Sequence, residues 1–376
     1  MTILPLFPST IRDSREAESA PVDARPALQA LCPEELVEIA EGIELGEARK
    51  LIALVHRGEP LPRRSPSEVR RSSLERVRAA TRLPELRLVA RTPSAVGGFV
   101  KYGLAAADGA VFEAVKIPLE RPDRVTVCVS SQVGCALACA FCATGRLGLL
   151  RNLDAWEIVE QLRVVKRDLL PGARIHGVVF QGMGEPLANW PEVRQAARVM
   201  SESSAQAVDA RNITISTAGL PAGIRALGAA LPNVRLALSI GSARTELRRE
   251  LIPLEGRHPL ETVLLAAGEH ARATRLVPLF AYTLLAEKND TPEDATALAA
   301  MVKDFAERYG KRPRLSLIPY NFIGAGDPFQ RADDARHARF REMLIAQGVV
   351  PTRRYSGGGD VAAACGQLAA TSLTAL

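Results

Sequence analysis

Apolar residues recur in short blocks that alternate with amphipathic stretches from about residue 124 to residue 350. The blocks are rich in Val, Ile and Leu, as strands covered on both faces are. Each block precedes a stretch whose apolar positions lie three and four apart, as on one face of a helix. We expect strands over 125–130, 177–180, 213–216, 234–239, 277–284 and 315–319. We expect helices over 154–168, 190–203, 220–230, 260–272, 291–309 and 332–347.

Two of these helices begin with recognisable N-terminal signals. Asp154 has Glu157 three positions later, as in a capping box, and Thr291-Pro292 fits an N-cap followed by proline. Six strand–helix repeats predict an α/β fold, a partial six-stranded (β/α)6 barrel with its site at the carboxyl ends of the strands. A doubly wound sheet is the alternative, although the Gly-rich dinucleotide fingerprint is absent after the first strand.

The chain before the repeats has a different pattern. Residues 1–28 lack periodicity and predict a disordered lead-in, whereas 33–56 have helical spacing. Asp108-Gly109 is a turn signal between two predicted hairpin strands, 99–104 and 111–117. We therefore divide the chain into a lead-in (1–28), a small N-terminal helical domain (29–95), a β-hairpin extension (96–123), the repeat region (124–350) and a C-terminal segment (351–376).

Charge is concentrated in the N-terminal part. Residues 57–91 contain ten Arg and four Glu, a net charge of +6 that equals that of the whole chain. This stretch is either a solvated helix face or a basic module that binds RNA, and an Arg-rich genome would give the same bias. No apolar run approaches the ~20 residues of a membrane helix, and the first residues do not resemble a signal peptide. We expect a monomeric cytoplasmic protein without membrane association.

Four of the six cysteines lie between positions 128 and 142. In a reducing compartment such crowding indicates a metal site or catalysis. Cys135, Cys139 and Cys142 form C-x3-C-x2-C after the first predicted strand. Three thiolates can hold three irons of a cubane cluster, and an iron without a protein ligand points to catalysis. The alternatives are unrelated buried cysteines or a zinc site, but the nearest downstream histidine, His176, is too distant for zinc-finger spacing.

This motif, with Phe141 before its last cysteine, resembles the signature of radical S-adenosylmethionine (SAM) enzymes. The resemblance implies a radical-SAM barrel and one [4Fe–4S] cluster on Cys135, Cys139 and Cys142. In that superfamily the open iron binds SAM, and reductive cleavage yields a 5′-deoxyadenosyl radical.

Further segments resemble one family, the Cfr/RlmN radical-SAM RNA methyltransferases. They are CVSSQVGC (128–135), GMGEPL (182–187), STAG (216–219), LIPYN (317–321) and AACGQL (363–368), in the family's order. The resemblance implies methylation of an aromatic carbon, C2 or C8, of an adenine in 23S rRNA. It leaves tRNA open as a second substrate and implies flavodoxin or ferredoxin as the reductant.

Two cysteines outside the motif acquire roles from this resemblance. Cys128 lies on the polar face of the first predicted strand, which would face the site. The alternative interpretation is that Cys128 is a small thiol buried in the core. Cys365 follows the flexible run 356–360. By resemblance Cys365 is the S-methylcysteine carrier, and Cys128 resolves a protein–RNA adduct through a transient disulfide. Two SAM molecules are consumed per turnover, one as methyl donor and one as radical source.

The family also implies a proton acceptor at Glu113. This residue shares a strand face with apolar residues, which predicts a buried carboxylate; the alternative is an exposed glutamate on an edge strand. One departure concerns Gly241, where the family usually has histidine. The SAM contacts implied by the resemblance are Gly184, Glu185, Ser216, Ser239, Ile240, Gly241 and Asn321.

Two rival functions remain at the level of sequence. A radical-SAM enzyme acting on a protein or small molecule would not need Cys128 or Cys365. A non-catalytic iron–sulfur protein that binds RNA or transfers electrons would not consume SAM, and would normally carry a fourth cluster cysteine.

Overall fold

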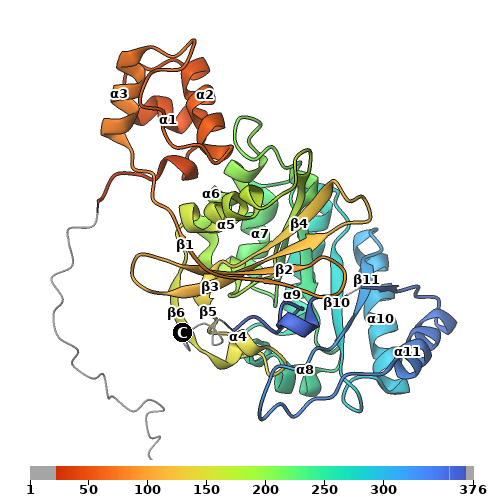
Figure 1. The fold of residues 1–376 in the computed structure, drawn as a ribbon. Coiled ribbons are helices and arrows are strands. Elements are labelled where there is room, and N and C mark those ends of the chain that lie inside the picture. The colour runs from red at the N-terminus through yellow and green to blue at the C-terminus, as the bar shows by residue number, and fades with distance from the viewer. Residues whose placement is uncertain (1–22, 355, 370–376) are drawn as a thin grey trace, which may run out of the picture.

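The computed structural model describes residues 23–354 and 356–369, so the expected lead-in lies mostly outside the described residues. Figure 1 shows a small group of N-terminal helices beside a large curved sheet with helices packed on its outer side. The sheet has ten strands in the order β1-β2-β3-β4-β7-β8-β9-β10-β11-β12, and β5 and β6 form a small second sheet.

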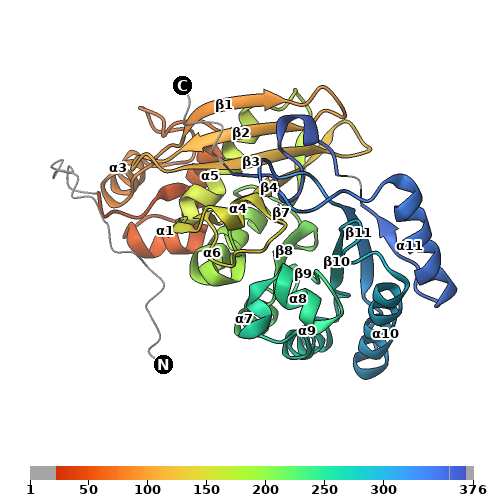
Figure 2. The same ribbon diagram turned by 90° about the horizontal axis from the view of Figure 1, so that it is seen from below.

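The predicted strand–helix repeats form the main part of this sheet, which confirms the α/β barrel. The strands are parallel and mostly buried because helices cover their outer face (Figure 2). They are β4 (Arg124–Val129), β7 (Arg174–Phe180), β8 (Ile213–Thr217), β9 (Arg235–Ser239), β10 (Leu279–Leu284) and β11 (Arg314–Pro319). The helices are α5 (Ala155–Arg167), α6 (Trp190–Ser201), α7 (Pro221–Ala230), α9 (Leu260–Thr274), α10 (Pro292–Tyr309) and α11 (Asp334–Ala346).

Both predicted helix starts are confirmed. The Asp154 amide donates to the Glu157 carboxylate at 2.8 Å at the start of α5. The Thr291 hydroxyl accepts from the Asp294 amide at 3.2 Å, and Pro292 is the first residue of α10. These contacts satisfy amides that have no partner within the helix.

The predicted hairpin is confirmed as β2 (Val100–Ala105) and β3 (Val111–Pro118), which pair antiparallel. Gly109 has φ +82° in the turn, where the Asp108 carboxylate accepts from the Ala110 amide at 2.9 Å. A further strand, β1 (Arg87–Pro93), pairs with β2. The sequence analysis had included β1 in the N-terminal helical part. Basic residues masked its strand character, and pairing with the apolar β2 decides the conformation.

The N-terminal helices are α1 (Pro33–Ile39), α2 (Leu45–His56) and α3 (Arg71–Ala80). The stretch 33–56 is helical as predicted, but it forms two helices, because Gly42 adopts φ +82° and interrupts the chain between α1 and α2. A glycine inside a helical pattern can be tolerated, so the residue alone does not announce the break. The Arg163 side chain of α5 donates to the Val55 carbonyl at 3.0 Å and links α2 to the sheet region.

Several short elements were not predicted. They are α4 (Ala143–Arg146), α8 (Thr245–Leu251), β5 (Gln132–Gly134), β6 (Leu149–Asn152) and β12 (Thr352–Arg353). Elements this short give little periodic signal. Among the described helices, none is both long and apolar enough to cross a membrane.

Candidate active site

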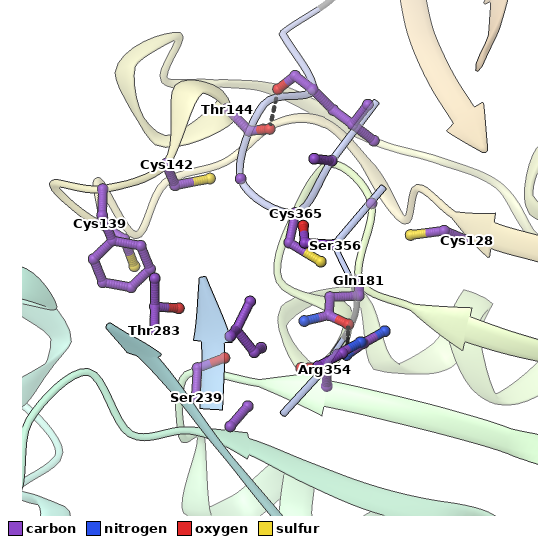
Figure 3. A pocket seen from close by; sticks show the side chains of 18 of the residues that line it. Cys128, Cys139, Cys142, Thr144, Gln181, Ser239, Thr283, Arg354, Ser356 and Cys365 are labelled. Carbon is purple, nitrogen blue, oxygen red and sulfur yellow. Dashed lines mark hydrogen bonds between the residues drawn. The ribbon is translucent and has the colours of Figure 1, made fainter. Parts of the chain in front are cut away.

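A pocket lies at the carboxyl ends of the parallel strands, on the inner side of the curved sheet (Figure 3). Its walls come from strand ends, from the cysteine loop (residues 135–142) and from the C-terminal segment. The structure therefore brings together residues that are widely separated in sequence. The predicted site residues that line the pocket are Cys128, Cys135, Cys139, Cys142, Gly184, Glu185, Ser216, Ser239 and Cys365.

Backbone contacts hold the cysteine loop in place. The Cys135 amide donates to the Gly148 carbonyl at 2.8 Å, and the Ala140 amide donates to the Leu251 carbonyl at 3.0 Å. Gly134 has φ +78°, and a Cβ at this position would lie 1.9 Å from the Gly148 oxygen. Only glycine fits there, so the β5–β6 hairpin can close tightly beneath the loop.

The three loop thiols interact electrostatically. Burial raises the pKa of each, for Cys135 to about 11, and the neighbouring thiols raise the pKa of Cys139 further. No three His, Cys, Asp or Glu side chains in the described part of the chain converge on a single metal ion. A cubane cluster has a different requirement, because each thiolate binds its own iron. Three soft thiolates without a lining histidine suit an iron–sulfur cluster.

Cys128 and Cys365 both line the pocket (Figure 3). Cys128 lies on β4 between Val115 of β3 and Val179 of β7, and it is 9% exposed. Burial raises the pKa of its thiol to about 12, and Cys365 raises it as well, whereas Arg354 lowers it. Both cysteines are free thiols that line the same pocket.

The loop that carries Cys365, residues 356–365, is fastened at its base. The Asn321 amide nitrogen donates to the Ser356 hydroxyl at 2.9 Å and to the Cys365 carbonyl at 3.1 Å. The Ala143 amide donates to the Gly366 carbonyl at 2.8 Å. One side chain thus closes both ends of this Cys365 loop, and the backbone beside Cys142 fixes the residue after Cys365.

The tip of the Cys365 loop is fastened to the segment that follows β1. The Asp360 carboxylate accepts from the Ser94 hydroxyl at 2.7 Å and from the Ala95 amide at 2.8 Å. Ser94 and Ala95 follow β1, so the loop bridges the antiparallel strands and the end of β11.

Glu185 presents its carboxylate to the pocket from the loop after β7. It is buried, and this burial raises its pKa, while hydrogen bonds from the Ala218 amide (2.9 Å) and the Leu187 amide (3.1 Å) oppose the rise. Gly184 has φ +98°, and a Cβ there would lie 2.5 Å from the Gln132 side chain. Glycine therefore allows the loop to pack closely enough to hold Glu185 in the pocket.

Ser216 and Ser239 end β8 and β9 at the pocket wall, but Ile240 and Gly241 are not part of the lining. Ile240 is fully buried and belongs to the core. Gly241 has φ +68°, and a Cβ there would lie 2.8 Å from the Ile252 side chain. A larger residue at position 241 would require both a backbone change and a shift of Ile252.

Comparisons with known proteins agree with this geometry. A model of the radical SAM superfamily matches residues 129–297. The chain is 57% identical over 364 residues to "Probable RNA methyltransferase sce3898" of Sorangium cellulosum, covering 92% of each chain. It is 43% identical over 282 residues to "Dual-specificity RNA methyltransferase RlmN" of Syntrophobacter fumaroxidans, covering 75% of this chain and 80% of the relative. The chain belongs to the RlmN-like family of radical SAM RNA methyltransferases.

A solved structure supports the same assignment. The crystal structure of a radical SAM methyltransferase from Sphaerobacter thermophilus superposes with a TM-score of 0.82 at 34% identity, covering 92% of this chain and 99% of that one. Membership in the radical SAM family implies a [4Fe–4S] cluster and SAM as cofactors. In this RlmN-like enzyme, the thiols of the cysteine loop are suited to hold the cluster, and the pocket beside them is suited to hold SAM.

Glu113 lies behind the pocket wall rather than in its lining. It is fully buried on β3, where its carboxylate pairs with Lys101 at 3.0 Å and accepts from the Ala369 amide at 2.9 Å. The exposed-edge alternative is wrong for this glutamate. Lys101 was missed by the sequence analysis, although it lies diagonally across the β2–β3 ladder and such neighbours interact.

Two further residues of the pocket, Arg354 and Gln181, were not predicted from the sequence. Both line the pocket, and the Arg354 guanidinium donates to the Gln181 side-chain oxygen at 2.8 Å (Figure 3). Arg354 immediately follows β12, and its amide donates to the Leu317 carbonyl at 2.9 Å. The pairing of β12 with β11 therefore places a cation near Cys128. No spacing rule in the sequence signals this pairing, because β12 has only two residues.

Proposed function

We propose that this enzyme methylates C2 or C8 of an adenine in 23S rRNA, by way of an S-methylcysteine at Cys365 that Cys128 resolves. The observation that carries the proposal is that two free thiols, Cys128 and Cys365, line the same pocket as the cysteine loop. The relatives named RNA methyltransferases support RNA as the substrate class. A generic radical SAM enzyme has no need of the additional thiol pair.

In this proposal Cys135, Cys139 and Cys142 hold the cluster. When bound there, the cluster and SAM supply a 5′-deoxyadenosyl radical, and flavodoxin or ferredoxin supplies the electron. Two SAM molecules are used per turnover. The residues proposed to position SAM are Gly184, Glu185, Ser216, Ser239, Ile240, Gly241 and Asn321. Among these, Glu185 offers a carboxylate for the SAM ammonium group, and the two serines offer hydroxyls.

A thiol carrier answers a chemical difficulty. The amidine carbons of adenine are electrophilic, so they do not attack the methyl group of SAM directly. In the proposed scheme, the S-methyl group of Cys365 would lose one hydrogen atom to the 5′-deoxyadenosyl radical, and the resulting methylene radical would add to the ring carbon. The adduct would then give up one electron, to the oxidised cluster, and the proton of the ring carbon, to Glu113. The Cys128 thiolate then attacks the Cys365 sulfur, and the bond from sulfur to methylene breaks. The electron pair of that bond stays on the methylene carbon, which takes up a proton and becomes the methyl group of the product. Cys128 and Cys365 are left joined by a disulfide, and the methylated RNA is released.

The proposal assigns the role of proton acceptor to Glu113. Its carboxylate is held by Lys101 and by the Ala369 amide, so a substrate can reach it only after the C-terminal segment moves. We also propose that the helical domain is an RNA-binding accessory. Its basic stretch includes the exposed Arg63 and Arg64, although other arginines serve local structure, such as Arg70, which pairs with Glu47 at 2.7 Å.

The decisive experiment is mass spectrometry of the Cys365 peptide from cluster-replete protein incubated with SAM. A gain of one methyl or methylene group on Cys365 is the expected result, and a Cys365→Ala protein is the control. Nucleoside analysis of 23S rRNA exposed to the enzyme then separates 2-methyladenosine from 8-methyladenosine. An unmodified Cys365 in active, SAM-cleaving protein would refute the carrier mechanism.

A further inference from the structure

An exposed aromatic residue lies beside the Cys365 loop. Phe322 is 63% exposed, and it is the only aromatic residue among the exposed large apolar side chains of the described chain. It follows Asn321, whose amide closes the Cys365 loop. The Phe322 carbonyl accepts from the Gln367 side chain at 2.8 Å, two residues after Cys365. The ring is thus anchored next to the methyl carrier while its surface remains open to solvent.

A cation without a carboxylate partner lies on the other side of Asn321. The Arg331 guanidinium donates to the Asn321 side-chain oxygen at 3.3 Å, and the residue is exposed. Within the described ranges Arg331 forms no ion pair, whereas the nearby Arg336 and Arg353 pair with Asp290 and Asp334. Asp334 lies within the electrostatic reach of Arg331 but is already bound by Arg353. Arg331 therefore has donors available for an external anion.

We propose that Phe322 and Arg331 bind the RNA strand at the pocket mouth: Phe322 stacks on an unpaired base next to the target adenine, and Arg331 binds the adjoining phosphate. The inference rests on the proposed function, because it takes RNA as the substrate. Proteins read unpaired RNA by stacking bases on aromatic rings and by placing cations along the backbone. Both features occur here: Phe322 is the residue after Asn321, and Arg331 donates a hydrogen bond to Asn321, which itself contacts the Cys365 carbonyl.

The two residues predict different changes in RNA binding. The probe is a fluorescein-labelled RNA hairpin with adenines in an unpaired loop, and anisotropy is measured over a series of salt concentrations. Phe322→Ala should weaken binding about 5- to 150-fold, with an unchanged dependence on salt. Arg331→Gln should also weaken binding and reduce the slope of log affinity against log salt by roughly 0.7, the value for one phosphate contact on a single strand.

Matched variants separate stacking from other effects. Phe322→Trp should keep or improve the affinity, and its fluorescence should be quenched when RNA binds, whereas Phe322→Leu should behave like the alanine variant. Leu265→Ala, at an exposed apolar position on α9, and Arg308→Gln, at an arginine paired with Asp304, are controls that should leave RNA binding unchanged. Equal affinity of the leucine and phenylalanine proteins would overturn the stacking contact.

A further readout separates this inference from the proposed function and from docking of a protein reductant. Methylation of Cys365 by SAM needs no RNA, so Phe322→Ala and Arg331→Gln should retain it. RNA methylation by both variants should remain reduced when dithionite replaces the protein reductant. Full recovery with dithionite would assign Phe322 to reductant docking and overturn the proposal. If the wild-type enzyme methylates RNA and both variants match it, the inference alone fails. If wild-type Cys365 is never methylated, the proposed function fails first.

Discussion

Replacing Asn321 with Asp should loosen the Cys365 loop while preserving the shape of the side chain. Asn321 is 5% exposed, and its amide nitrogen donates to Ser356 and to the Cys365 carbonyl. An aspartate places an acceptor oxygen where that donor was, so the bond to the Cys365 carbonyl is lost, whereas the Ser356 hydroxyl can rotate and donate to the new oxygen. Its other oxygen can still accept from Arg331, which limits disturbance of the pocket rim.

The size of the effect follows from the one lost bond. A hydrogen bond contributes about 0.5–1.5 kcal/mol net, so opening of the loop should become easier by about this amount. This free energy corresponds to an opening equilibrium that rises about 2- to 12-fold. The repulsion between a carboxylate and the Cys365 carbonyl adds to this value, so the range is a lower bound.

Hydrogen exchange measured by mass spectrometry on the peptide 356–369 tests this expectation. The Ala363 amide, which donates to the Gly358 carbonyl at 2.8 Å, exchanges only when the loop opens, so its exchange should accelerate by the same factor. Ser356→Ala removes one bond and leaves the other, and should give roughly a 2- to 12-fold acceleration. Exchange of Asn321→Asp within twofold of wild type would refute the assignment of Asn321 as the clamp of the loop.

Four further outcomes are expected. Cys135→Ala should abolish the brown colour of anaerobically reconstituted protein, because the cluster loses a thiolate; a retained cluster would contradict the ligand assignment. Cys128→Ala should accumulate protein covalently bound to RNA in denaturing gels, because the resolving thiol is absent; clean turnover would exclude that role. The pKa of Cys128 is raised to about 12, so its alkylation rate should climb about tenfold per pH unit through pH 10, whereas a plateau near pH 9 would indicate an ordinary thiol. Lys101→Met should lower the free energy of unfolding by about 3–5 kcal/mol in denaturant titrations, because it leaves the buried Glu113 without its cation; the double variant Lys101→Met/Glu113→Gln should recover part of this loss.

The strand–helix repeats were predictable because each strand is buried on both faces and each helix has one apolar face. The cysteine motif was equally visible, since its spacing is local. The break at Gly42 was not predicted, because a glycine inside a helical pattern can be tolerated as well as end the helix. Strand β1 was assigned incorrectly because its partner, β2, decides its conformation. Such errors concern residues whose structure depends on a neighbour in space.

The site was predictable only in part for the same reason. Motifs could name Cys128 and Cys365, but only the fold places both in one pocket. Three contacts join segments that are remote in sequence or lie on different strands. They are Asn321 with the Cys365 loop, Lys101 with Glu113, and Arg354 with Gln181. No residue pattern announces them. They determine how the thiols are held, and so they matter for any account of the reaction.

These contacts tie the two reactive parts of the pocket together. The Ala143 amide, directly after Cys142, donates to the Gly366 carbonyl, directly after Cys365. A displacement of the cysteine loop is therefore transmitted to the neighbourhood of Cys365 through one backbone hydrogen bond. Asn321 supplies the second fixed point from the end of β11. In the proposed function Cys365 must meet Cys128 as well as the substrate, so its loop has to release at least one of these points during turnover. The side-chain clamp at Asn321 is the one that can yield while the cysteine loop, pinned by the tight backbone approach at Gly134, keeps its place.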